Sequence, residues 1–191
     1  MNSFEQIATR MRQHAMQLPP EKIMVSLPDA RKHLYEALAF FVEYEKQQPV
    51  WLPEYDEIAD WLAGNQGRGL FLFGNHGRGK SLMCRYVLPA LLLKYCHKVV
   101  SVFDVQAMNR DIDRALSKHL LSLDDIGTEE VVNNFGNRRL AFAEIMDAAE
   151  KQNKLVIVST NLNLDALRAT YGERTLERIK STTRRVLFSG A

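Results

Sequence analysis

The 191-residue sequence has no long hydrophobic run, and this excludes a membrane-spanning helix. Its longest apolar stretch, residues 87–93, is interrupted by Pro89 and falls far short of the roughly 20 residues that cross a bilayer. The amino terminus carries an early acid and lacks the basic start and apolar core of a secretory signal peptide. We therefore expect a cytoplasmic protein that does not bind a membrane.

Cysteine is also scarce. Cys84 and Cys96 are the only two, and they form no Cys-x-x-Cys pair, so neither a disulfide framework nor a zinc site is indicated. We expect both to be reduced, buried thiols. Hydrophobic residues make up 46% of the chain and charged residues 25%, which is typical of a folded domain and excludes a disordered or collagen-like chain.

Charge of one sign does not dominate, because the net charge is only +2, but its distribution is uneven. Residues 67–120 hold 9 Lys and Arg against 3 Asp and Glu, whereas residues 121–164 hold 4 against 7. Basic blocks that alternate with acidic ones suit a protein that handles a polyanion such as a nucleotide.

The order of apolar segments predicts an α/β fold. The first third favours helices, over 4–17, between Pro28 and Gln47, and over 53–63. Short apolar runs then alternate with helical patterns, which implies parallel strands joined by right-handed crossovers and covered by helices on both faces. The expected strands are 69–73, 98–103, 119–124, 154–159 and 185–189, and the expected helices are 79–95, 105–117, 136–152 and 163–182.

A phosphate-binding motif follows the first expected strand. It reads Gly74-Asn75-His76-Gly77-Arg78-Gly79-Lys80-Ser81, a complete G-x-x-x-x-G-K-S before a helical stretch. In such a P-loop, backbone N–H groups surround a phosphate, the lysine reaches the terminal phosphates and the serine hydroxyl ligates Mg²⁺. The flanking strand and helix disfavour the alternative of a simple glycine-rich turn.

Two adjacent acids, Asp124 and Asp125, stand at the carboxyl end of the third expected strand. In a Walker B arrangement Asp124 holds Mg²⁺ and Asp125 polarises the attacking water. The alternative is a strand that ends in a helix-capping aspartate, and the P-loop some 40 residues earlier makes it the weaker interpretation. After the next strand, Asn161 contacts the γ-phosphate or the lytic water, or else caps the helix that begins near 163.

Together these motifs resemble a known family. The P-loop, Leu-Asp-Asp-Ile-Gly at 123–127, Ser-Thr-Asn-Leu at 159–162 and the segment 171–179 are similar to AAA+ ATPases of the DnaC/IstB type. These are bacterial and phage replicative helicase loaders and transposase helper ATPases. The resemblance covers residues 66–189. It implies a five-stranded parallel P-loop NTPase core at 66–191, with a helical extension at 1–65 packed on it and no carboxyl-terminal lid domain.

The resemblance also implies ligands and partners. It implies ATP and Mg²⁺, a homo-oligomer in which Arg178 acts as an arginine finger in trans, and a replicative helicase or a transposase as the protein partner. Arg174 is the second candidate for the finger, and both arginines could instead pair with acids on their own helix. Single-stranded DNA is left open, because Arg110, Arg114 and Lys118 at i, i+4 and i+8 suit either phosphate contacts or a solvated face.

We therefore expect an ATPase that acts on a protein–DNA assembly in DNA replication and is slow until it assembles. The first alternative is a nucleotide-dependent scaffold or transposition helper with little turnover. A small-molecule P-loop kinase is a more distant alternative, because it leaves Asn161 and the late arginines without a role.

Overall fold

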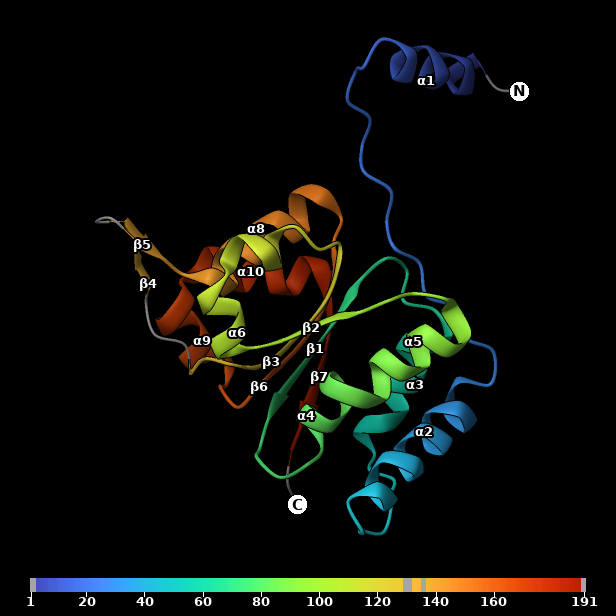
Figure 1. Cartoon of the computed structure of the whole chain (residues 1–191), viewed down its shortest axis with the longest axis vertical. Helices are drawn as coiled ribbons and strands as arrows, with labels where there is room; N and C mark the ends of the chain where they lie inside the picture. Colours follow the sequence, from blue (N-terminus) through green and yellow to red (C-terminus); the bar gives the residue numbers. More distant parts are fainter. Residues whose placement is uncertain (1–2, 129–131, 135–136, 190–191) are drawn as a thin grey trace.

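The computed structural model describes residues 3–128, 132–134 and 137–189, and its centre is a five-stranded sheet (Figure 1). The strands are β1 (Gly69–Gly74), β2 (Ser101–Asp104), β3 (Leu120–Ile126), β6 (Leu155–Thr160) and β7 (Thr183–Phe188). They lie in the order β2-β3-β6-β1-β7, and every neighbouring pair is parallel. The carboxyl ends of β3, β6, β1 and β7 therefore meet at one edge of the sheet, where ligands bind in folds of this kind.

Helices cover both faces of this sheet, and Figure 1 shows the two groups on opposite sides. One face carries α2 (Ala30–Tyr44), α3 (Glu54–Ala63), α4 (Lys80–Leu82), the π-helix η1 (Met83–Val87) and α5 (Leu88–Cys96). The other carries α6 (Val105–Arg110), α7 (Ile112–Leu116), α8 (Ala141–Gln152), α9 (Leu164–Tyr171) and α10 (Glu173–Thr182).

Strand β1 shows why two helical layers are needed. Leu70 and Leu72 belong to the core beneath α2, α3 and α5, whereas Phe71 belongs to the core beneath α8 and α10. All three side chains are fully buried. Because successive side chains of a strand point to opposite faces, a strand that is apolar at every position must be covered on both sides.

Three expected helices are interrupted, each at an identifiable residue. Helix 79–95 is divided into α4, η1 and α5. Pro89, near the start of α5, has no N–H and its ring would collide with the carbonyl of Arg85 four residues earlier, so the wider π turn relieves the clash. Helix 163–182 is divided at Gly172, which has a φ of 81°.

Helix 105–117 is divided at Asp111, whose φ of −144° is not helical and whose side chain accepts from the Arg114 N–H to cap α7. The expected single helix face that joins Arg110, Arg114 and Lys118 is therefore not formed. Lys118 lies beyond the end of α7.

The segment before α8 differs from the sequence expectation. A helix was expected from 136, but residues 137–139 form strand β5 (Asn137–Arg139), which pairs antiparallel with β4 (Val132–Asn134). Helix α8 begins at Ala141, where buried residues start to recur at helical spacing: Ala141, Phe142, Ile145, Met146 and Ala149. The asparagines that precede it have low helix propensity.

The amino-terminal third contributes two helices to the core. Leu34 and Leu38 of α2 and Trp61 and Leu62 of α3 are almost completely buried and pack in one cluster with Leu70. Helix α1 (Ser3–Gln13) has no buried residue, and Figure 1 shows it apart from the sheet at the end of an extended segment. Whether residues 1–65 form a unit separate from 66–191 stays a prediction.

Neither cysteine forms a disulfide, Cys84 being buried and Cys96 partly exposed. Among the described residues, no helix is long and apolar enough to span a bilayer.

Candidate functional site

The P-loop after β1 folds around its own lysine. Lys80 is only 5% exposed, and its Nζ donates to the carbonyl oxygens of Gly74 at 2.9 Å and Asn75 at 2.6 Å. Burial lowers the pKa of Lys80, while the charges of Asp125 and Asp124 oppose this shift. The ammonium is thus held by the carbonyl groups of its own loop.

Two glycines allow the loop to approach its neighbours. Gly74 has a φ of 117°, and a Cβ there would lie 2.4 Å from the carbonyl oxygen of Phe188 at the end of β7. The N–H of Asn75 donates to that same oxygen at 2.8 Å. Gly79 has a φ of 81°, and a Cβ there would lie 2.6 Å from the Tyr55 hydroxyl. A side chain at either position would push the loop away from its supports.

The two acids at the end of β3 are held by one serine. Ser159, which is buried on β6, donates through Oγ to Asp124 Oδ1 at 2.5 Å and accepts from the Asp125 N–H at 2.9 Å. Asp125 has a φ of 60°, and the β3–β6 register shifts between Leu123 and Ile126. This left-handed residue turns the chain, so that the two carboxylates have different surroundings.

Asn161 lies beside the second acid. Its Nδ2 donates to Asp125 Oδ1 at 2.7 Å. The capping role that was the alternative for Asn161 belongs to Asn163, whose side chain accepts from the Ala166 N–H at the start of α9. Asn161 and Asp125 therefore form one polar pair at the edge of the sheet.

The residues suited to Mg²⁺ are fewer than a complete metal site requires. Asp124 is 4% exposed, and its Oδ2 lies 3.7 Å from an Arg85 nitrogen. Ser81 is exposed in the first turn of α4. Within the residues that the structure describes, no group of three or more His, Cys, Asp or Glu side chains could hold a metal ion. One carboxylate and one hydroxyl fit Mg²⁺, which takes its remaining ligands from water and substrate phosphates.

The side chain of Arg78, in the middle of the P-loop, pairs with a residue of α3. Its guanidinium binds the carboxylate of Glu54, with Nε at 3.0 Å and Nη2 at 2.8 Å from Oε1 and Nη2 at 3.1 Å from Oε2. Glu54, the first residue of α3, is 6% exposed. The next residue, Tyr55, donates from its hydroxyl to the Arg78 carbonyl at 3.4 Å. The exposed His76 lies in the same loop.

The two candidate finger arginines differ sharply in exposure. Arg178 is 8% exposed on α10, where it contacts Asp147 and donates through Nε to Glu150 at 3.0 Å, both acids of α8. The side chain of Arg174, one turn earlier, is 78% exposed and lies 3.9 Å from Asp147. Arg178 thus connects two helices of one chain, whereas Arg174 projects outward.

We expect Arg178→Ala to lower the free energy of unfolding by about 2 kcal/mol, because it removes charge-assisted bonds to two carboxylates. Arg174→Ala is the matched control and should change this free energy by less than about 0.5 kcal/mol. Urea denaturation of both variants measures the difference. Equal stabilities would show that the contacts of Arg178 with α8 contribute little.

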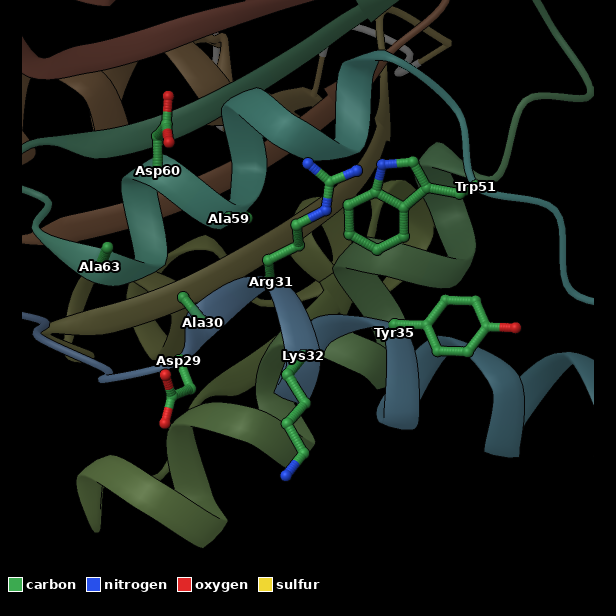
Figure 2. A pocket seen from close by; sticks show the side chains of 9 residues that line it. All are labelled: Asp29, Ala30, Arg31, Lys32, Tyr35, Trp51, Ala59, Asp60 and Ala63. Carbon is green, nitrogen blue, oxygen red and sulfur yellow. The ribbon is translucent and has the colours of Figure 1, made fainter.

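A large pocket lies elsewhere, between α2 and α3. It has a volume of about 730 Å³ and is lined by Asp29, Ala30, Arg31, Lys32, Tyr35, Trp51, Ala59, Asp60 and Ala63. Figure 2 shows Arg31 directed toward Trp51, and its guanidinium carbon lies 5.0 Å from the ring centroid. No P-loop residue lines this pocket, so it is separate from the candidate nucleotide site.

Two residues that support the site, Ser159 and Glu54, are not indicated by the sequence. Ser159 was visible only as part of the Ser-Thr-Asn segment, and nothing in its spacing indicates that it bridges both acids. Glu54 follows Pro53 at a helix start, where an acid is already favoured by the helix dipole. Neither pairing leaves a local signal, because each joins segments at least 24 residues apart.

No protein-family model matches the sequence, and no curated protein matches it. Among solved structures, the chain is similar to the DnaC helicase loader, with a TM-score of 0.52 and 19% identity over 86% of this chain and 93% of that one. It is also similar to AMPPCP-bound DnaA from Aquifex aeolicus, with a TM-score of 0.53 and 14% identity over 73% of this chain and 48% of that one. DnaI aligns with 24% identity over 65% of this chain and 71% of that one, with a TM-score of 0.49.

The two structures with TM-scores above 0.5 show that this chain shares their fold. The predicted fold class, a five-stranded parallel sheet between helices with a P-loop after the first strand, is thereby confirmed. The chain shares this fold with the DnaC helicase loader and with AMPPCP-bound DnaA.

Proposed function

We propose that the chain binds and hydrolyses ATP at the edge formed by the carboxyl ends of β1, β3 and β6. The observation that carries this proposal is that the P-loop after β1, the two acids of β3 and Asn161 after β6 come to one edge of the sheet, because these three strands are parallel neighbours. Ser159 binds both Asp124 and the Asp125 N–H, and Asn161 binds the Asp125 carboxylate. A glycine-rich turn with only a structural role would require none of these partners.

Each residue has a distinct task in this proposal. Lys80 exchanges its two loop carbonyls for terminal phosphate oxygens, and Asp124 and Ser81 hold Mg²⁺. When bound, Mg²⁺ neutralises charge on the phosphates. Asp125 orients the attacking water and accepts its proton, and the Asn161 amide fixes the Asp125 carboxylate through the 2.7 Å bond.

The biological task proposed is a replication role like that of a helicase loader. It is supported by the motif order and by the fold shared with a structure described as the DnaC helicase loader. The proposed partners are a second copy of this chain and a replicative helicase. A transposase remains the alternative partner.

A nucleotide-dependent scaffold with little turnover is a second candidate, and one observation favours it. The arginine that the resemblance assigns to catalysis, Arg178, is occupied by Asp147 and Glu150 of its own chain. An ATP site without a cation from a neighbour would hydrolyse slowly and act through binding alone.

The rate of ATP hydrolysis against protein concentration distinguishes the two candidates. An assembling ATPase should show a specific activity that rises with concentration, and single-stranded DNA should be included and omitted in parallel series. ATP binding by calorimetry with no turnover at any concentration would favour the scaffold. Absence of ATP binding would contradict both.

Asp125→Asn should retain ATP binding but lower the rate of hydrolysis by about 100-fold or more, because an amide does not accept a proton as a carboxylate does. Asparagine tolerates the left-handed φ of 60° at this position and keeps an oxygen for Asn161. Single-turnover hydrolysis and calorimetry measure the two effects. Turnover equal to wild type would assign the proton to another group.

A further inference from the structure

We infer that Glu54 is a positioning residue of the nucleotide site, which holds the P-loop in its binding shape through Arg78. The inference rests on the proposed ATP site and adds a residue from the amino-terminal helices to it. The juxtaposition that carries it is a buried carboxylate at the start of α3 bonded to the guanidinium in the middle of the loop.

The geometry of this pair is that of a fixed anchor. Glu54 accepts from both Nε and Nη2 of Arg78, and the side chains of Glu54 and Arg78 are 7% and 22% exposed. Two bonds between planar groups set an orientation as well as a distance. Surface ion pairs with one contact and high exposure do not constrain their backbone in this way.

The anchor acts on the part of the loop that must keep an unusual backbone. Arg78 lies between Gly77, with a φ of 72°, and Gly79, with a φ of 81°. Because flexible glycines flank it on both sides, little in the local chain holds Arg78 in place. The restraint on this part of the loop comes from Glu54 of α3, which binds the side chain of Arg78.

Tyr55 supports the same segment from the next position of α3. It is 3% exposed, its hydroxyl donates to the Arg78 carbonyl, and its ring packs near Phe188 with centroids 6.2 Å apart. Burial, and then the charge of Glu54, raise the pKa of Tyr55 to about 12, so its hydroxyl remains a donor at neutral pH. The start of α3 therefore contacts the loop through two adjacent side chains.

The charge of Glu54 and its proposed positioning role predict opposite changes in ATP affinity when Glu54 is removed. The sign of the change therefore tests the inference. Glu54 places a negative charge beside a site for a polyanion, so its removal should by charge alone strengthen ATP binding. If Glu54 acts by holding Arg78, its removal should instead weaken binding, because the loop must then be ordered when ATP binds.

The experiment measures ATP affinity by calorimetry in the 191-residue chain for Glu54→Ala, Arg78→Ala and the double variant. Glu54→Ala should lower the affinity about tenfold in the wild-type background and have little further effect in the Arg78→Ala background. Steady-state rates of Glu54→Ala should show a higher KM with a nearly unchanged kcat. Glu54→Gln keeps the shape and one acceptor oxygen, and it should retain part of the ATP affinity. It replaces Glu54→Ala in the experiment if that variant does not fold.

Asp56→Ala provides the matched control on the same helix. Asp56 also pairs with an arginine, Arg31 at 2.7 Å, which lies beside Trp51 in the pocket of Figure 2. Its removal should leave ATP affinity unchanged. Thermal unfolding without nucleotide, measured for both variants, separates lost stability from lost affinity.

Three results would overturn the inference. The first is an affinity of both Glu54 variants that equals or exceeds that of wild type. The second is an effect of Glu54→Ala that persists undiminished in the Arg78→Ala background. The third is a wild-type chain that binds no ATP, which would overturn the proposed function as well, whereas the first two leave that function intact.

Discussion

Lys80→Ala is expected to lower the affinity for ATP by about 100-fold, because two or more charge-assisted bonds to phosphate oxygens are lost. The variant also loses two hydrogen bonds within the P-loop, because this ammonium donates to the carbonyls of Gly74 and Asn75. Calorimetry with ATP and Mg²⁺ measures the affinity. The rise in Tm that ATP produces in the wild-type chain should also disappear.

The control for this variant is the folded state without nucleotide. Burial of the Lys80 ammonium is itself unfavourable, as the lowered pKa indicates, so its removal should cost little stability. Lys80→Arg keeps the charge but requires more space than a 5% exposed site offers. A folded Lys80→Ala chain with wild-type ATP affinity would contradict the P-loop assignment.

Arg174→Ala is expected to lower ATP hydrolysis in the assembled protein by about 1000-fold while ATP binding is unchanged, as for a guanidinium supplied to a neighbour's phosphate. The resemblance assigned this role first to Arg178 and second to Arg174. The two placements favour Arg174, because its side chain is 78% exposed, whereas Arg178 would have to leave two carboxylates. Hydrolysis rates at a protein concentration that supports assembly measure the effect.

A mixing experiment tests whether the arginine acts in trans. Neither Arg174→Ala nor Lys80→Ala alone should turn over, but mixed assemblies pair the intact P-loop of one subunit with the intact arginine of the next. Part of the activity should therefore return on mixing. Recovery with Arg178→Ala instead of Arg174→Ala would support the assignment that the resemblance made first. No recovery with either variant, in assemblies confirmed by light scattering, would exclude a finger on α10.

The sequence alone was sufficient to predict the parallel five-stranded sheet and the position of the P-loop within it. These features are local or periodic: apolar runs of strand length, helical spacing between them, and a motif of eight consecutive residues. Their order along the chain limits the topology, because parallel strands need crossovers of one hand. Asp124, Asp125 and Asn161 could be placed for the same reason, since the two acids lie near the end of an apolar strand and Asn161 follows another.

Tertiary structure alone decided which side chains hold these residues in place. Ser159 bridges Asp124 and the Asp125 backbone, and Glu54 binds Arg78, across separations of 34 to 35 and 24 residues. It also decided that Arg178 faces α8 while Arg174 is exposed, although both lie on the same short helix. Such pairings depend on how the helices and strands pack against one another. Residue type and spacing along one chain do not predict these contacts between distant segments.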